Sequence, residues 1–130
     1  MLANPKVRAV IDMAQPTALI LAAVLHFMPA SEGAALCAEY MKRAAPGSWL
    51  ILSSGHYQDK ELADRLQETA THTRFFNHSA ADLAAILGGL EPVAPGVSEA
   101  RQWITGTGGE PPGTPVYPLV AVAVKPGEAG

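Results

Sequence analysis

The feature that most constrains the fold is the succession of an apolar run, an amphipathic segment and a second apolar run within residues 17–55. Residues 18–25, ALILAAVL, lie between two prolines and contain no polar side chain. This pattern predicts a parallel strand covered on both faces of a sheet, because the run is too short for a typical buried helix. Residues 49–55, WLILSSG, predict a second strand. The order strand, helix, strand predicts a β-α-β unit with a right-handed crossover.

An amphipathic helix is expected between these two strands. Ser31 is its expected N-cap, and Pro46 with Gly47 ends it. Apolar side chains recur at helical spacing on the face that would meet the sheet: Leu36, Cys37, Tyr40, Met41 and Ala44. Cys37 is the only cysteine, so an internal disulfide is excluded and a reducing cytoplasm is the natural setting. Its place on the apolar face favours an inert core thiol over a reactive one.

The second half of the chain predicts two more helices and two strands. Asp59 begins one helix, and Ser79 with Asp82 forms the sequence pattern of a capping box for the next. Residues 97–104 and 116–125 predict strands, which would be antiparallel because their short connection cannot hold a crossover helix. The glycine-rich connection is read as a hairpin loop and not as a phosphate-binding turn, since no helix follows it. The elements predict one α/β domain over residues 1–125 and a flexible tail over residues 126–130.

Charge and hydropathy exclude two classes of partner. The formal net charge is −3 and no basic stripe occurs, which argues against nucleic acid. The longest apolar run has eight residues, whereas a membrane-spanning helix needs about 20. The charged fraction is only 16%, so we expect more exposed apolar surface than a small monomer usually carries, and hence a protein partner.

Candidate site residues follow each predicted strand of the β-α-β unit. His26 follows the first strand, at the sheet edge where ligands gather in open α/β folds. Its imidazole would take a proton from a substrate hydroxyl or amine or orient that group, or else would only bond to nearby backbone and shape a pocket wall. Ser54, Gly55 and His56 occupy the corresponding end of the second strand and either line the pocket or simply form a turn.

The remaining polar candidates have simpler interpretations. His72 and His78 are expected to be exposed. Arg74 would place a guanidinium over a substrate, or the two phenylalanines that follow it would anchor the loop to the core. The four histidines are not spaced as metal ligands, so no metal site is predicted.

Several segments together resemble a known family: residues 4–12 (NPKVRAVID), 24–29 (VLHFMP), 46–51 (PGSWLI) and 89–97 (GLEPVAPGV), with Trp103. They resemble the actinobacterial S-adenosyl-methionine-dependent methyltransferases once classed as a domain of unknown function. The resemblance runs almost from end to end, but it covers only the C-terminal half of that family. It implies the later part of a seven-stranded Rossmann-like sheet, from just before the fourth strand.

The resemblance implies S-adenosyl-L-methionine as the cofactor and a small molecule as the methyl acceptor. By resemblance, Leu25, His26 and Phe27 border the methyl-donor pocket, and Ser54, Gly55 and His56 lie near the substrate. His78 stands where many relatives have arginine. The family's glycine-rich turn and ribose-binding acidic residue precede the matching region, so this chain lacks them.

Three hypotheses follow. The chain is a truncated, cytoplasmic methyltransferase that is inactive by itself, or half of a split enzyme completed by an N-terminal half on a partner chain. The third hypothesis is a non-enzymatic interaction module that uses the edge of its first strand to pair with itself, as a homodimer, or with another protein.

Overall fold

The structure is a computed structural model that describes residues 4–57, 59–69, 76–105 and 116–127. Its strands are β1 (Ala18–Ala22), β2 (Trp49–Tyr57), β3 (Glu91–Pro92), β4 (Ser98–Glu99) and β5 (Val116–Val124). Its helices are α1 (Pro5–Arg8), α2 (Ala30–Arg43), α3 (Lys60–Thr69), α4 (Ala80–Leu87) and α5 (Ala100–Thr105). A single 3-10 turn, η1 (Leu25–Phe27), follows β1.

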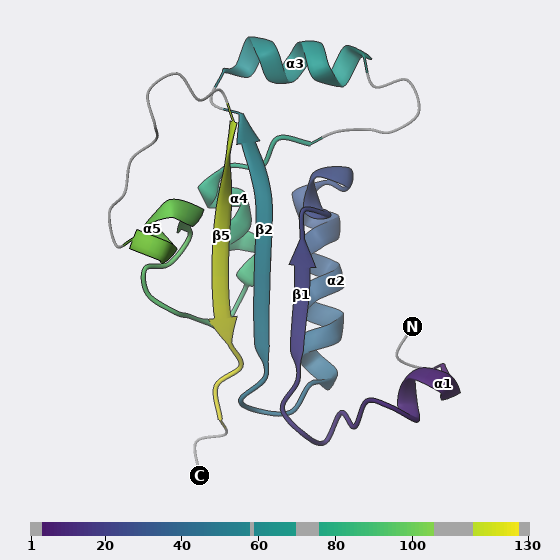
Figure 1. Cartoon of the computed structure of the whole chain (residues 1–130). Helices are drawn as coiled ribbons and strands as arrows, with labels where there is room; N and C mark the ends of the chain where they lie inside the picture. Colours follow the sequence, from purple (N-terminus) through teal and green to yellow (C-terminus); the bar gives the residue numbers. More distant parts are fainter. Residues whose placement is uncertain (1–3, 58, 70–75, 106–115, 128–130) are drawn as a thin grey trace.

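The strands form one mixed sheet in the order β1-β2-β5-β3, with β4 also paired to β5. β1 and β2 are parallel, in a register that aligns Ala18 with Trp49. β5 lies antiparallel to β2 along its whole length (Figure 1). β3 and β4 are also antiparallel neighbours of β5. The predicted α/β class, the parallel β-α-β unit and the antiparallel last strand are confirmed.

β1 is shorter than its apolar run, and only one of its faces is covered. Ala23 has a φ of 55°, which is outside the extended region and turns the chain out of the sheet before Leu25. Leu19 and Leu21 are partly buried, whereas Ile20 between them is 59% exposed. The prediction of a strand covered on both faces was therefore wrong, because the described helices do not cover the second face of β1.

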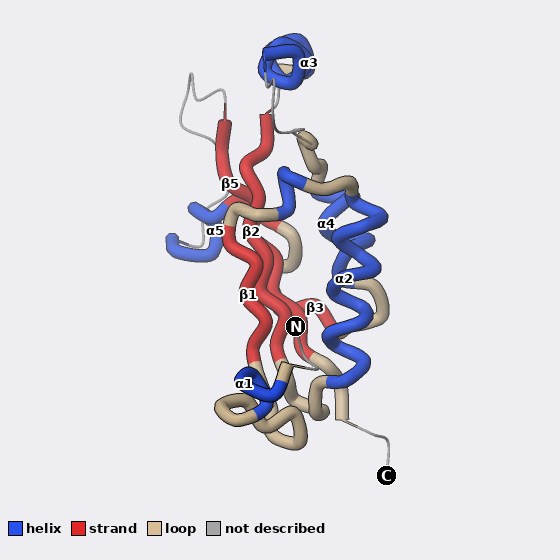
Figure 2. The backbone as a smooth tube through the Cα atoms, turned by 90° about the vertical axis from the view of Figure 1, so that its right-hand side faces the viewer, coloured by secondary structure: helices blue, strands red, loops and turns tan. Residues whose placement is uncertain are grey.

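Helices α2 and α4 cover one face of the sheet (Figure 2). Leu50 and Leu52 of β2 are completely buried beneath them, together with Ala121 of β5. Gly33 allows the close approach of the two helices, because a Cβ at this position would lie 3.3 Å from Cδ1 of Ile86. The core thus lies between the two helices and the sheet.

The two ends of α2 differ from the sequence expectation. The helix begins at Ala30, with Pro29 as its N-cap and no side-chain cap, so Ser31 is not the N-cap. The helix ends at Arg43, before the predicted stop. Lys125, just after β5, donates from Nζ to the carbonyl oxygens of Met41 at 2.9 Å and Ala44 at 2.6 Å. The last turn of α2 is therefore capped by a residue more than eighty positions away.

Among the described helices, α5 is the one that covers the opposite face of the sheet, where it lies over β5 (Figure 2). The predicted strand over residues 97–104 was wrong, since only Ser98 and Glu99 pair with β5 before the chain becomes helical. Trp103 of α5 donates from Nε1 to the carbonyl oxygen of Val120 at 3.2 Å, and this contact holds the helix on the sheet.

Beside α5, the described residues leave the same face open over β1 and β2. We call this surface the open sheet face; it consists of Ala18, Ile20, Ala22, Trp49 and Ile51. Ile20 is 59% exposed and Trp49 is 42% exposed. The glycine-rich connection and residues 128–130 of the predicted tail lie outside the described residues. Within the described ranges, no helix is long and apolar enough to cross a membrane.

Candidate functional site

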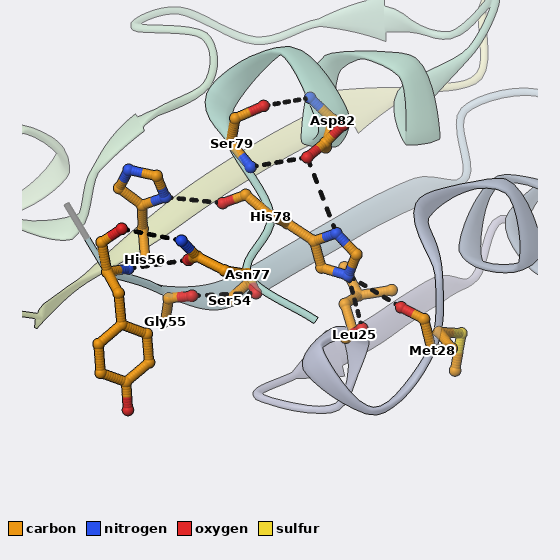
Figure 3. Close-up of polar contacts among 10 residues, drawn as sticks. Leu25, Met28, Ser54, Gly55, His56, Asn77, His78, Ser79 and Asp82 are labelled. Atoms are coloured by element: carbon orange, nitrogen blue, oxygen red, sulfur yellow. Dashed lines mark hydrogen bonds and ion pairs between the residues drawn. The ribbon is translucent and has the colours of Figure 1, made fainter. Parts of the chain in front are cut away.

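β1 and β2 run in parallel toward the same edge of the sheet, where Ala22 ends β1 beside Ser53 and β2 continues to Tyr57. His26 follows β1 in η1, and His56 lies near the end of β2. The segment 76–79, just before α4, passes between these two ends and contacts both (Figure 3). The fold thus brings together three histidines from distant parts of the sequence.

His78 is the most buried of these histidines, with 3% of its surface exposed. Its Nε2 lies 2.7 Å from the carbonyl oxygen of Leu25 and 3.0 Å from that of Met28 (Figure 3). A carbonyl oxygen only accepts, so Nε2 carries the hydrogen and donates to both. The prediction that His78 is exposed was wrong, because its ring fills the turn between β1 and α2.

Two further contacts fasten the segment before α4 to the end of β2. His56 donates from Nδ1 to the carbonyl oxygen of His78 at 2.8 Å. The amide of Asn77 bonds to both backbone groups of Tyr57, at 2.9 Å and 2.8 Å. The sequence did not indicate a role for Asn77. The burial of His78 could have been expected from its place directly before the N-cap Ser79, where side chains often pack against the following helix.

The backbone of His26 is hydrogen-bonded to the segment before α4, while its ring is partly exposed. Its carbonyl oxygen accepts a hydrogen bond from the backbone N–H of Phe76 at 2.8 Å, and its ring lies 4.1 Å from the ring of Phe27, centroid to centroid. Burial, and secondly repulsion from His78, lower the pKa of the His26 imidazole from its ordinary 6.5. His26 is therefore neutral at neutral pH and able to accept a proton.

The other predicted site residues occupy contrasting environments. The Leu25 side chain is completely buried in the core, whereas Phe27 is 52% exposed. Ser54 is also buried, and its hydroxyl donates to the carbonyl oxygen of Gly55 at 3.5 Å. Arg74 and His72 lie outside the described residues. The functional roles of all these residues stay predictions.

Two cavities lie away from the histidines. One, of about 380 Å³, lies between α2 and α4 and includes Cys37 and Met41 in its wall. Burial raises the pKa of the Cys37 thiol to about 11, which agrees with an inert core thiol. The other lies beside α1 and is lined by Arg8, Ile11, Asp12, Met13, Ala14 and Arg43. In the part of the chain that the structure describes, no group of three histidine, cysteine or carboxylate side chains is placed to hold a metal ion.

A comparison with protein families decides the relationship of this chain to known proteins. Residues 1–126 match the family described as S-adenosyl methyltransferase. The chain belongs to this family. The family name and the related solved structures identify S-adenosyl-L-methionine as the cofactor. No curated protein matches the chain.

Solved structures share the fold. A candidate methyltransferase from Thermobifida fusca aligns with a TM-score of 0.79 at 22% identity, and a DUF574 family protein from Streptomyces avermitilis aligns with 0.78 at 25% identity. The alignments cover 96% of this chain and 49% and 50% of the respective structures. The magnesium protoporphyrin IX methyltransferase of Synechocystis, solved with bound SAH, aligns with 0.50 at 23% identity over 88% of this chain and 49% of its own. This chain spans about half the length of these structures.

The described residues fit only part of S-adenosyl-L-methionine. The half-exposed ring of Phe27, beside His26, offers an aromatic surface that suits a flat base. A ribose is commonly held by a free carboxylate. The carboxylate in this cluster, Asp82, already accepts the backbone N–H of Ser79 at 2.8 Å. Near the three histidines the described residues thus offer an aromatic surface for the base, while the Asp82 carboxylate is already hydrogen-bonded and is not a free partner for a ribose.

Proposed function

We propose that this chain forms the acceptor-side half of an S-adenosyl-methionine-dependent methyltransferase that acts on a small molecule. The observation that carries the proposal is the family match over residues 1–126, together with alignment to about half of each solved structure. Placement in the C-terminal half, actinobacterial origin and a cytoplasmic setting belong to the same proposal. His26 and Phe27 would border the methyl donor, and Ser54, Gly55 and His56 would lie toward the acceptor.

In this proposal the chain's own residues orient the acceptor and handle its proton. His26 is neutral at neutral pH because its pKa is lowered, so it can accept the proton of an acceptor hydroxyl or amine. Methyl transfer asks for alignment more than for covalent work by the protein, because the cofactor carries the reactive group. We expect the 130 residues alone to be inactive, because they align with only about half of each solved structure.

Calorimetry tests this proposal directly. Titration of the 130-residue chain with S-adenosyl-L-methionine and with S-adenosyl-L-homocysteine should give no heat of binding at micromolar concentrations. Addition of a polypeptide with the glycine-rich turn and the ribose-binding acidic residue should restore binding. Micromolar binding by the chain alone would show that its own residues complete the pocket.

A specific feature of the sheet favours a complementing chain as partner. β1 pairs only with β2 among the described strands. The hydrogen bond from the Trp49 N–H to the carbonyl oxygen of Thr17 shows that odd-numbered residues direct their backbone groups toward β2. The backbone groups of Ala18, Ile20 and Ala22 therefore point away from β2. An added strand would bond to these groups, and an accompanying helix would cover the open sheet face.

A mixing experiment separates the two partner hypotheses. The probe is the half of the Streptomyces avermitilis DUF574 family protein that this chain does not match. A one-to-one complex by light scattering would support the split enzyme. A homodimer that persists in the presence of this probe would favour the interaction module instead.

A further inference from the structure

We propose that His78 is a positioning residue whose ring holds η1 in the conformation that presents His26. The importance of His26 to the reaction rests on the proposed function. We call the two hydrogen bonds from the His78 ring to this turn the clamp. The clamp rests on the geometry of the turn alone.

The ring of His78 bonds to the backbone on both sides of the residues that it positions. The carbonyl oxygens of Leu25 and Met28, at 2.7 Å and 3.0 Å from Nε2, flank His26 and Phe27 in the sequence. The turn between them is short, and two hydrogen bonds join its own backbone: the N–H of Phe27 donates to the carbonyl oxygen of Val24, and that of Met28 to the carbonyl oxygen of Leu25, each at 3.1 Å. The shared Nε2 hydrogen therefore adds a constraint that so short a turn cannot supply itself.

His78 is well placed to act as a clamp because its own position is fixed. Its carbonyl oxygen accepts from Nδ1 of His56, near the end of β2. Its ring is stacked with that of Phe76, with the planes 8° apart. The next residue, Ser79, begins α4 with a capping box formed with Asp82. Displacement of the His78 ring would therefore require movement of the β2 end or of α4.

A second tie joins the same two segments through the backbone. The N–H of Phe76 donates to the carbonyl oxygen of His26 itself at 2.8 Å. The turn is thus held at Leu25, His26 and Met28 by a segment about fifty residues later. The location of His26 relative to β2 depends on this segment and not on β1 alone.

The geometry also determines the tautomer of His78. Nε2 must carry a hydrogen, because both of its partners are acceptors. Nδ1 lies 4.0 Å from Oδ2 of Asp82, which is beyond hydrogen-bond distance. The neutral ring is therefore the Nε2–H form.

Nitrogen-15 NMR of the unmodified chain tests the tautomer without any substitution. At a pH where the ring is neutral, the His78 resonances should show a protonated Nε2 and an unprotonated Nδ1. An Nδ1–H tautomer would overturn the proposal, because Nε2 could then not donate to the turn.

Two variants test the clamp. His78→Gln keeps an amide donor at a similar reach, and His78→Met keeps the length of the side chain but removes the donor. In the Met variant we expect the Phe76 amide to exchange about tenfold faster, as the loss of one to two hydrogen bonds implies, and the His26 ring resonances to move. The Gln variant should retain most of the protection.

Lys125→Met is the matched control, since it weakens the opposite end of α2 and leaves η1 intact. Unchanged Phe76 exchange and His26 resonances in His78→Met would overturn the proposal, and so would equal losses in the Gln and Met variants. If His78→Met does not fold, the Gln variant and the tautomer decide. None of these readouts needs methyl transfer, so the clamp can be confirmed even if the proposed function is wrong.

Discussion

At the scale of single residues, the site is governed by where three imidazoles come to lie. His26 retains a partly exposed ring, His78 is enclosed, and His56 uses Nδ1 on the backbone. Histidine thus serves as a candidate base at position 26 and as a donor to the turn backbone at position 78. At position 56 it is a donor that joins β2 to the segment before α4. The sequence predicted the place of His26 after a strand, but it could not distinguish the three environments, because burial depends on residues distant in the chain.

The lowered pKa of His26 predicts a specific pH dependence. The unfolded chain binds more protons than the native chain between the lowered pKa and about 6.5. Stability due to a neutral His26 should therefore fall as the pH falls through this window, and it should not change above it. Urea unfolding of the wild type and of His26→Gln, at about pH 5 and about pH 7.5, measures the effect. The variant should lose less stability at the acidic pH; an equal loss would show that His26 titrates normally.

At the scale of elements, the N-caps of α4 and α2 show which helix ends the local sequence determines and which it does not. Ser79 caps α4 as its sequence pattern predicted, with the Asp82 N–H donating to its Oγ at 3.1 Å. Ser31 looks like a similar cap but lies inside α2. A capping box involves only neighbouring residues, so it was predictable. The start of α2 was set instead by Pro29 and by the turn before it.

This contrast predicts opposite outcomes for two serine substitutions. Ser79→Ala should lower the free energy of unfolding by about 1 kcal/mol, because the N-terminal amides of α4 lose their acceptor. Ser31→Ala should change it by less than about 0.5 kcal/mol, because alanine suits a helix interior at least as well as serine. Chemical denaturation of both variants gives the comparison. A similar loss in both would mean that Ser31 also caps α2.

The C-terminal end of α2 provides a second test at this scale. Lys125→Met should lower the free energy of unfolding by about 1.5 kcal/mol, because the helix carbonyls lose a charged donor. Lys42→Met is the control, since this exposed lysine lies on the same turn of α2 and its side chain can be replaced without removing the cap. Thermal and urea unfolding should separate the two variants; equal stability would argue that water caps α2 as well as Lys125 does.

At the scale of the whole molecule, the sheet is covered unevenly. Helices α2 and α4 cover one face, and α5 covers only the β5 side of the other (Figure 2). The alternation of burial along β1 could not be read from a run in which every residue is apolar. Exposure there depends on which elements are present to cover the strand, and this is a property of the assembled sheet.

The open sheet face predicts how the chain associates. Ile20→Lys should weaken the complex with a complementing half at least about tenfold, because a charge would be buried beside an added strand. Leu36→Lys is the matched control: Leu36 is 46% exposed but lies on α2, away from this face. Light scattering and calorimetry of the mixtures measure the difference. Equal binding by the two variants would place the partner elsewhere.

The amino-acid sequence by itself determined the parallel β-α-β unit, the capping box of α4, the antiparallel last strand and the resemblance to a methyltransferase family. Each of these depends on neighbouring residues or on a pattern along one segment. Only the tertiary structure decided that His78 is buried against η1, that Lys125 caps α2 and that one face of β1 is uncovered. The first two are contacts between segments fifty or more residues apart, and the third is exposure that depends on how the described elements pack over the sheet. No local pattern encodes either.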